Sequence, residues 1–287
     1  MSQTDLALDI IRNAIVNGEF SLGESLSEIK ICEKYNLFLM EDNCDSFGSK
    51  YAGQYTGTFG DISTLSFYPA HHITTGEGGA VLTNKPKLKK ILESLRDWGR
   101  DCYCPPGKDN TCKKRYDWQL GGLPHGYDHK YIYSNIGYNL KSSDMQAALG
   151  CSQIEKLPDF IKKRKENFNY LYEGFSSFED FILPIKSKDA DPSWFGFPIS
   201  LKEESNLKRL ELLKFYDERN IGTRLLFGGN LTLQPAYLNT EFRIPNKLTI
   251  SDFVLKNTFW LGVYPGLTND MLDYVIKTTS EFIEKSK

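Results

Sequence analysis

The spacing of apolar residues changes from helical to strand-like within the first part of the chain. Residues 4–17 place their apolar side chains on one helical face, which predicts a short amphipathic helix. The runs 37–40, 62–68 and 80–83 are short and apolar, as is typical of buried strands. Two acidic residues follow the first run, and open α/β sheets bind their ligands at such strand ends. The pattern therefore predicts an α/β sheet with a ligand site at one edge.

The middle of the chain alternates helical sequence with a long irregular stretch. Residues 86–98 keep leucine and isoleucine on one face and predict a helix. Residues 105–137 are rich in Gly, Pro, Asp, His and Tyr without periodicity, which predicts a long ordered loop. Long loops inside compact domains are usually functional. A helical region then runs over 143–175 and is expected to bend or break at Pro158.

The last part of the chain reads as a smaller α+β domain. We expect strands at 194–199 and 223–227, a helix at 207–218, and a closing helix at 268–284. Strands and helices in this order form a sheet with helices packed on it.

Composition and charge narrow the class of function. The chain has 35 basic and 37 acidic residues and a formal net charge of -2, without runs of one sign. Nucleic acid and membrane surfaces are therefore not expected as partners. The apolar runs are too short to cross a bilayer. We expect a cytoplasmic protein with a small-molecule ligand.

Clustered cysteines carry the first chemical signal. Cys102, Cys104 and Cys112 follow the pattern Cys-x-Cys-x7-Cys, and with the upstream Cys44 they can close a four-sulfur metal site. The surrounding loop is polar and broken by Pro and Gly, so a lone structural cysteine would have little to pack against. The alternative is ordinary reduced thiols. A disulfide framework is disfavoured because no signal peptide opens the chain.

The densest motif is Ser-Phe-Tyr-Pro-Ala-His-His-Ile-Thr-Thr-Gly-Glu-Gly-Gly at residues 66–79. A predicted strand here runs into His71 and His72 and then into a glycine-rich turn. A hairpin turn with solvent-facing imidazoles is the alternative interpretation.

This segment resembles the cofactor-binding segment of the sugar aminotransferase family of fold-type I pyridoxal phosphate enzymes. Where those aminotransferases carry the lysine that holds the cofactor, this chain has His71. That change resembles the nucleotide-sugar 3-dehydrase branch, and the cysteine pattern resembles its iron–sulfur members, which act on CDP-4-keto-6-deoxy-D-glucose. The resemblance runs from about Cys32 to the C-terminus and includes the segments 97–101, 137–140, 223–230 and 262–266.

The resemblance implies roles for residues near the cofactor. Pyridoxamine phosphate would bind without a covalent link, and His71 would act as the base, because an imidazole moves protons but forms no Schiff base. Asp42 would pair with the pyridine nitrogen, or alternatively caps a strand end. Asp45 would lie near the ring hydroxyl and Ser66 at the phosphate. Asn139 would reach the phosphate of the other subunit in a homodimer, or alternatively forms a turn.

The resemblance also implies an electron-transfer centre. Cys44, Cys102, Cys104 and Cys112 would hold a [2Fe–2S] cluster that delivers single electrons. A flavin and iron–sulfur reductase would be the electron donor. Neither the sequence nor the resemblance assigns a role to His72 or Arg224.

The first thirty residues depart from the family. Residues 11–20 and 23–28 resemble the opening of a GntR-type regulator, and the family's Gly/Ser-rich phosphate turn is missing. We therefore expect an unrelated helical segment at 1–30, a truncated cofactor-binding large domain at 31–155, and a small C-terminal domain at 156–287. The fold class expected is α/β, a fold-type I transferase with an incomplete large domain. An inactive remnant whose cysteines hold zinc is the alternative function.

Overall fold

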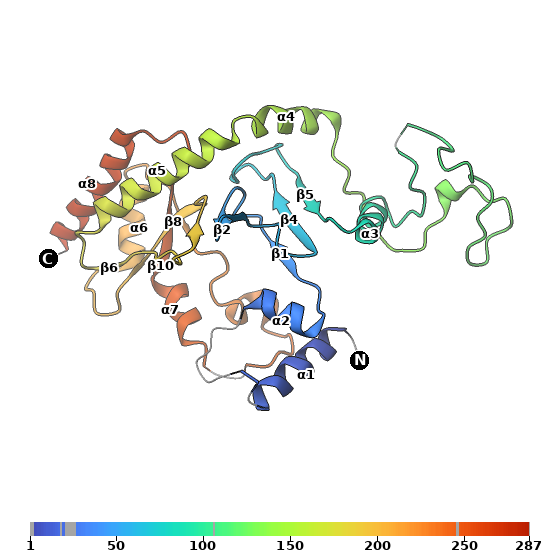
Figure 1. Ribbon diagram of the computed structural model, residues 1–287. Coiled ribbons are helices and arrows are strands. Elements are labelled where there is room, and N and C mark those ends of the chain that lie inside the picture. The colour runs from blue at the N-terminus through green and yellow to red at the C-terminus, as the bar shows by residue number, and fades with distance from the viewer. Residues whose placement is uncertain (1–2, 18, 21–26, 106, 245–246, 287) are drawn as a thin grey trace. The chain divides into compact units, whose positions relative to one another are not determined.

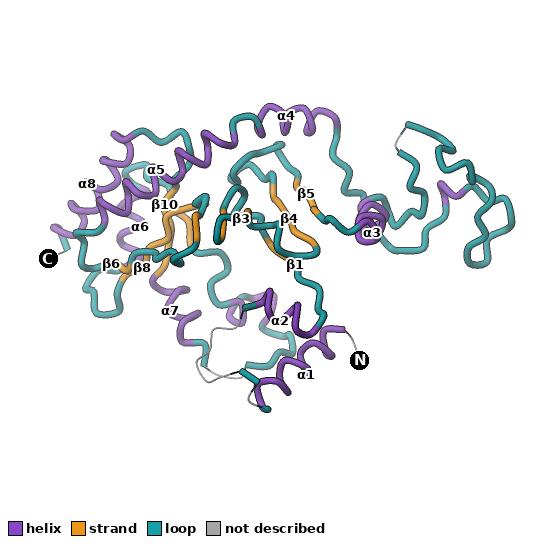
Figure 2. Tube along the Cα trace, viewed as in Figure 1, coloured by secondary structure: helices purple, strands orange, loops and turns teal. Residues whose placement is uncertain are grey.

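The computed structural model describes residues 3–17, 19–20, 27–105, 107–244 and 247–286 (Figures 1 and 2). The chain divides into two compact units. Unit 1 consists of Met1–Cys44 and Thr56–Gln153, and unit 2 consists of Asp45–Tyr55 and Ile154–Lys287. The segment from Asp45 to Tyr55 thus groups with the C-terminal part of the chain. Most of the GntR-like segment at 23–28 lies outside the described residues, and the domain division at 155 and 156 stays a prediction.

Unit 1 combines helices with a small sheet. Ser27 caps the second helix, since its side chain accepts a hydrogen bond from the Lys30 N–H, and Asn36 ends that helix in the left-handed conformation at φ 52°. The helices are α1 (Gln3–Val16), α2 (Glu28–Tyr35), α3 (Pro86–Arg96), α4 (Asp144–Ile154) and the 3₁₀ helix η1 (His129–Tyr131). Pro86 opens α3, where its missing N–H costs nothing.

The sheet of unit 1 has the strand order β1-β4-β5. The strands are β1 (Met40–Asp42), β4 (Ile62–Ser66) and β5 (Gly79–Leu82). The first two strands run parallel with Asp42 opposite Thr64, and β5 is antiparallel to β4 with Ser66 opposite Gly79. The sheet is therefore mixed, as expected. Its register brings Asp42, Thr64 and Ser66 to the same end.

Residues 101–137 form an irregular loop that includes the stretch predicted at 105–137, and η1 is a regular turn within it. The loop is anchored where it leaves α3. Gly99 has φ 82°, and a Cβ at this position would overlap the carbonyl oxygen of Asn135. Arg100 pairs with Tyr133 in an isolated bridge, and the Asp101 N–H donates to the Ile132 carbonyl at 2.9 Å. These contacts close the loop on itself and bring its two ends together.

Unit 2 contains two antiparallel sheets and the helices around them. One sheet has the order β6-β8-β10-β9 and the other the order β3-β2-β7. The strands are β2 (Lys50–Tyr51), β3 (Gln54–Tyr55), β6 (Phe181–Ile182), β7 (Ala190–Asp191), β8 (Gly196–Leu201), β9 (Thr223–Leu225) and β10 (Thr258–Gly262). The helices are α5 (Leu157–Phe175), α6 (Arg209–Asp217), α7 (Thr249–Asn257), α8 (Asn269–Lys285), and the 3₁₀ helices η2 (Leu231–Leu233) and η3 (Pro235–Tyr237).

A large aromatic and aliphatic core holds unit 2 together. Phe197 on β8 and Phe259 on β10 are fully buried between the sheet and its helices. Phe168 on α5 stacks on Trp194 with ring centroids 3.8 Å apart. The buried Tyr216 hydroxyl on α6 lies 2.6 Å from the Thr279 hydroxyl on α8. Burial of such side chains is worth roughly 1.5–3 kcal/mol each, so this core is the main source of stability in unit 2.

Most expected elements are present. The helices predicted at 4–17, 86–98, 207–218 and 268–284 are confirmed as α1, α3, α6 and α8. The helical region at 143–175 is two helices, α4 and α5, because Pro158 lies in the first turn of α5. The sequence did not predict α2, α7, β10 and the two-residue strands.

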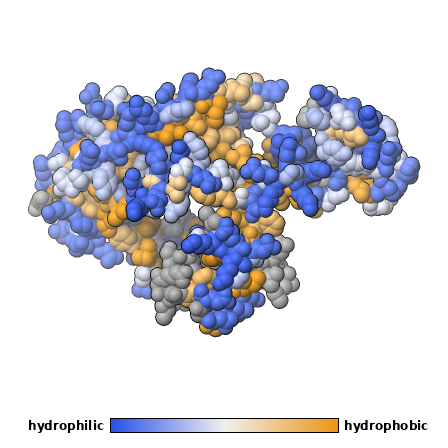
Figure 3. Space-filling view, viewed as in Figure 1, coloured by the Kyte–Doolittle hydropathy of each residue, from blue (hydrophilic) through white to orange (hydrophobic). Residues whose placement is uncertain are grey.

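Apolar side chains lie on the outer strands of the unit 1 sheet. Met40 on β1 is 67% exposed and Val81 on β5 is 51% exposed. On the face drawn in Figure 3, orange apolar surface lies among blue hydrophilic surface. No described helix combines the length and the apolar character that crossing a membrane requires.

Candidate functional site

Asp42 stands at the end of β1 with its carboxylate held in place. Its Oδ1 atom accepts hydrogen bonds from the Cys44 N–H at 3.2 Å and from the Thr64 hydroxyl at 3.1 Å. The Cys44 thiol and N–H, followed by the Thr64 hydroxyl, hold the pKa of Asp42 below its usual range. The parallel register of β1 and β4 places Thr64 for this contact. Asp42 is therefore an ionised, oriented carboxylate near neutral pH.

His71 lies in the turn that follows β4. Its Nδ1 atom is 2.8 Å from the carbonyl oxygen of Cys44, and its backbone N–H donates to the Tyr68 carbonyl at 3.0 Å. Because a carbonyl oxygen only accepts, Nδ1 carries the proton and the lone pair of the neutral ring is on Nε2. The Tyr68 ring meets the imidazole edge to face, with centroids 6.0 Å apart. The turn thus fixes both the orientation and the tautomer of His71.

Ser66 and the glycine-rich turn lie beside this histidine. The Ser66 hydroxyl oxygen accepts a hydrogen bond from the Tyr68 N–H at 3.3 Å. The Phe67 N–H donates to the Gly78 carbonyl, and the Thr75 N–H donates to the Phe67 carbonyl. These bonds fold residues 66–78 back on themselves. The alternative interpretation of two solvent-facing imidazoles is wrong for His72, which is buried.

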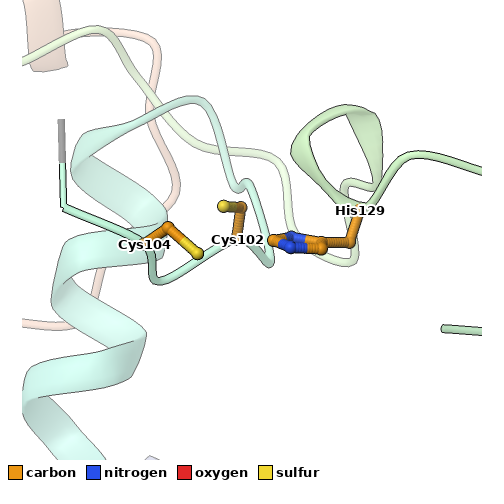
Figure 4. A group of neighbouring side chains, drawn as sticks. All are labelled: Cys102, Cys104 and His129. Carbon is orange, nitrogen blue, oxygen red and sulfur yellow. The ribbon is translucent and has the colours of Figure 1, made fainter. Parts of the chain in front are cut away.

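Three cysteines of the irregular loop form a second cluster, which we call the loop thiols: Cys102, Cys104 and Cys112. The ligand atoms of Cys102, Cys104 and His129 all lie within 4.8 Å of one another (Figure 4). The Cys112 sulfur lies 3.2 Å from Nε2 of His129. The Thr111 hydroxyl, then the Cys112 N–H and the neighbouring thiols, lower the pKa of Cys104 to about 7, while burial raises the pKa of Cys102. The chemistry of this cluster suits a thiophilic metal.

Cys44 is placed with the Asp42 site. Its sulfur lies 3.4 Å from the Thr64 hydroxyl, and it is not among the grouped ligand atoms of Cys102, Cys104 and His129. The six cysteines, all within the described part of the chain, form no disulfide there. Metal ligation by Cys44 stays a prediction.

The remaining predicted residues are spread over both units. Asp45 belongs to unit 2, where it lines a pocket of about 240 Å³ together with Ser49, Trp194 and other residues of that unit. Asn139 is exposed and pairs through its backbone with Asp97. Arg224 on β9 is exposed and donates to the carbonyl of Thr223 at 2.8 Å. The cofactor roles of Asp45 and Asn139 stay predictions.

Two site residues were missed from the sequence. His129 lies 17 positions after Cys112 in irregular sequence, and nothing in the spacing marks it. Thr64 appears as a plain strand residue, although it contacts both Asp42 and Cys44. Its only signal is its place two residues before Ser66 in the same strand.

Known proteins resemble this chain over most of its length. The family model of the DegT/DnrJ/EryC1/StrS aminotransferases matches residues 23–280. The lipopolysaccharide biosynthesis protein RfbH of Salmonella typhimurium is 59% identical over 260 residues, covering 90% of this chain and 60% of that protein. The dTDP-4-dehydro-2,6-dideoxy-D-glucose 3-dehydratase of Saccharopolyspora spinosa is 55% identical over 257 residues, covering 90% and 56%. The chain thus spans less than two thirds of the length of these relatives.

Solved structures agree with the sequence comparisons. The Escherichia coli GDP-4-keto-6-deoxy-D-mannose-3-dehydratase with bound hydrated PLP superposes with a TM-score of 0.73 at 26% identity, covering 87% of this chain and 62% of that one. The aminotransferase TlmJ from Streptoalloteichus hindustanus shares the fold with a TM-score of 0.71 at 19% identity, covering 90% and 61%. The predicted fold class, α/β of fold-type I, is confirmed by these structures. This chain belongs to the DegT/DnrJ/EryC1/StrS aminotransferase family.

Proposed function

We propose that this chain carries the base and cofactor side chains of a nucleotide-sugar 3-dehydratase in deoxysugar or lipopolysaccharide biosynthesis. The observation that carries the proposal is His71, held by the Cys44 carbonyl at 2.8 Å where family aminotransferases have lysine. The names of two relatives, a 3-dehydratase and a lipopolysaccharide biosynthesis protein, support it. An ordinary aminotransferase needs the lysine that His71 replaces.

The residues present fit a pyridoxamine or pyridoxal phosphate cofactor. Asp42 is ionised because bonds from its neighbours hold its pKa low, and an ionised carboxylate suits a protonated pyridine nitrogen. Asp45 would bond the ring hydroxyl, and Ser66 and Asn139 would bond phosphate. When bound, the cofactor supplies an electron sink for the sugar carbons.

His71 acts as the proton-moving group in this proposal. With Nδ1–H donated to Cys44, the ring presents the lone pair of Nε2 as the base. Positioned general bases of this kind contribute about 10²–10⁴-fold to a reaction rate. The same nitrogen, once protonated, is suited to give its proton to a departing hydroxyl group at C3 of the sugar.

The loop thiols support an electron-transfer role. Removal of the C3 oxygen requires two electrons beyond dehydration, and a [2Fe–2S] cluster transfers electrons one at a time. We propose Cys44 and the loop thiols as its ligands, a flavin and iron–sulfur reductase as electron donor, and CDP-4-keto-6-deoxy-D-glucose as substrate. We further propose a homodimer working in the cytoplasm, with the exposed Asn139 of one subunit serving the cofactor of the other.

Cofactor attachment tests the role of His71. Wild-type chain and the His71→Lys variant are incubated with pyridoxal phosphate, reduced with borohydride and digested. Peptides containing residue 71 are then weighed by mass spectrometry. We expect covalent cofactor on the lysine variant and reversible binding in the wild type. Equal labelling of other lysines in both proteins, with none at position 71, would contradict the proposal.

Substrate preference needs a separate assay. Turnover of 4-keto-6-deoxy sugars linked to CDP, dTDP and GDP is compared in the presence of a reductase. We expect preference for the CDP sugar in the wild type and loss of turnover in His71→Asn, with cofactor binding kept. Preference for the dTDP or GDP sugar would refute the substrate assignment alone.

A non-catalytic metal-binding protein is the second candidate function. The grouping of Cys102 and Cys104 with His129, which Cys112 also contacts, favours it, because thiolates and an imidazole also satisfy a structural zinc site. An anaerobic preparation that is brown and bleaches on reduction supports the cluster. A colourless protein with stoichiometric zinc supports the second candidate.

A further inference from the structure

The part of the chain that carries the loop thiols is basic, although the chain as a whole is acidic. Residues 85–130 contain 11 Lys or Arg and 6 Asp or Glu, whereas the rest of the chain contains 24 Lys or Arg and 31 Asp or Glu. Positive charge is thus concentrated around the loop thiols, while the formal net charge is -2. Charge that is segregated in this way steers a partner of opposite sign to one part of a protein surface.

Three of these lysines flank the loop thiols. Lys90 on α3 places its Nζ atom 5.5 Å from the ring centroid of Tyr103, the residue between the first two loop thiols. Lys113 and Lys114 follow the third loop thiol directly, and the Lys114 N–H donates to the Cys112 sulfur at 3.4 Å. We call Lys90, Lys113 and Lys114 the flanking lysines. They bring positive charge to both ends of the cysteine pattern.

The charges of the flanking lysines are available to a partner. All three residues are exposed, and none of them forms an ion pair with another residue of the described part of the chain. Two other cations of the same loop are committed, since Arg115 pairs with Asp128 and Lys130 pairs with Asp109. An exposed ammonium group contributes little to the stability of its own fold. The flanking lysines therefore have no structural task in the described loop.

The backbone presents Lys113 in an unfavourable conformation. Its φ of 56° lies in the left-handed region, which glycine and asparagine adopt more readily than lysine. The Lys113 N–H donates to the Asn110 carbonyl at 3.0 Å, and the Asn110 side chain accepts from the Arg115 N–H at 3.2 Å, so the turn is held by its own bonds. A turn that served shape alone would favour glycine here. A lysine at this position indicates that its side chain is used.

A redox centre that is served by another protein needs a surface for brief contact. Cys102 and Cys104, drawn in Figure 4, are only partly buried, and Tyr103 between them is 53% exposed. Electron-transfer complexes bury little area, and opposite charges on the two partners raise the rate of their encounter. An exposed aromatic ring with charged residues around it matches the usual arrangement of such contacts, with an aromatic centre and a polar rim.

We infer that Tyr103 and the flanking lysines form the docking surface for the electron-donor protein, and that this donor carries carboxylates around its own redox cofactor. The inference rests on the proposed electron-transfer role of the loop thiols. It adds to that role the face on which the donor binds and the sign of the charge that the donor presents. Carboxylates near the flanking lysines would hold the donor beside the loop thiols for the time that the transfer requires.

Charge reversal of the flanking lysines tests this surface by binding. The variant combines Lys90→Glu, Lys113→Glu and Lys114→Glu. A control of the same net charge reverses three exposed lysines of unit 2: Lys188, Lys208 and Lys277. The probe is a plant-type [2Fe–2S] ferredoxin, a small acidic electron carrier, and its binding is measured by calorimetry at about 0.01 M and about 0.15 M ionic strength, where the Debye length is about 30 Å and about 8 Å.

Wild type and control should bind the ferredoxin, more weakly at the higher ionic strength. The variant should bind it about tenfold more weakly than the wild type at the lower ionic strength, because three exposed charge pairs are lost. Circular dichroism checks that each protein is folded. Absence of binding by the wild type, or equal binding by wild type and variant, would overturn the inference. Tighter binding of a single-stranded DNA oligonucleotide than of ferredoxin by the same lysines would overturn it as well.

Reduction of the cluster-loaded chain is the second readout. Reduction by the ferredoxin should be about tenfold slower in the variant, whereas reduction by photoreduced deazaflavin, a small molecule that needs no docking surface, should keep its rate. Equal slowing with both reductants would contradict docking, because the lysines would then act on the reduction potential. Ferredoxin binding requires no cluster. Binding that depends on the flanking lysines in a chain that assembles no cluster would therefore support the docking surface and count against the proposed function alone.

Discussion

Glu41 is the residue whose replacement should most directly disturb the sheet edge that carries Asp42. Its carboxylate accepts three backbone hydrogen bonds from one loop, with the N–H groups of Gly57 at 2.7 Å, Phe59 at 2.8 Å and Gly60 at 2.6 Å. The loop precedes β4, the strand that supplies Thr64 to Asp42. Replacing Glu41 by alanine removes both carboxylate oxygens and with them all three hydrogen bonds.

The expected magnitude follows from these contacts. A hydrogen bond to a charged group contributes about 1.5–3 kcal/mol, which gives an upper limit of roughly 4.5–9 kcal/mol for three. Contacts within one network are not additive, and water reaches part of this loop, so we expect a loss of about 3 kcal/mol in the local opening free energy for Glu41→Ala. At about 1.4 kcal/mol per factor of ten, amide exchange in the loop should become about 100-fold faster.

Hydrogen exchange measured by mass spectrometry on peptides covering residues 56–61 is the assay. Glu93→Ala is the matched control, because the Glu93 side chain on α3 is 44% exposed and pairs with Lys89 at 3.7 Å. Surface pairs of this kind are worth about 0–1 kcal/mol, so the control should leave the loop unchanged. Equal exchange in wild type and Glu41→Ala would show that the carboxylate does not hold the loop.

Three other changes have outcomes that can be worked out in the same way. Lys85 and then the Leu39 N–H lower the pKa of Asp61 in the folded protein. The contribution of Asp61 to stability is therefore present above about pH 4 and is lost as the pH falls through the folded-state pKa. Asp61→Asn should flatten the acid-unfolding profile in that window, and an unchanged pH profile would contradict this. Tyr216→Phe removes the buried hydrogen bond to Thr279 and should cost about 1 kcal/mol in denaturant unfolding, whereas the exposed Tyr274→Phe should cost much less. Val81→Lys places a charge on the outer strand β5 and should reduce self-association measured by light scattering. A variant that associates as the wild type does would contradict this.

Strong local signals were enough to predict the long elements. Pro86 and the leucine spacing after it specify α3, and the apolar run after residue 61 specifies β4. The first strand was displaced, since it was expected at 37–40 and runs from Met40 to Asp42. The reason is Asp61, whose carboxylate accepts from the Leu39 N–H while its own N–H donates to the Leu39 carbonyl. Pairing with β4 therefore starts at Met40, the residue after Leu39. This is a tertiary effect that the spacing of apolar residues does not reveal.

Other features depend on partners far away in the sequence. The strands β2 and β7 are two residues each, and their pairing joins positions near 50 and 190. Two residues carry no periodic signal, so a pattern-based prediction leaves them as loop. His129 was missed for a related reason, because it meets Cys112 through an irregular loop whose geometry is set by bonds to Arg115. The chemical types at the site were predictable, and their grouping was not.

Cys44 connects the two chemical signals of the sequence in a way that changes how mutants should be interpreted. Its carbonyl orients His71, and its N–H bonds the Asp42 carboxylate. Both contacts use the backbone, while the thiol touches Thr64 and lowers the pKa of Asp42. A Cys44 variant that shifts this backbone would therefore lose activity through displacement of the carboxylate and the base as readily as through loss of a metal ligand. Ligand counting at the metal separates these explanations, because displacement of Asp42 leaves the loop thiols and His129 untouched.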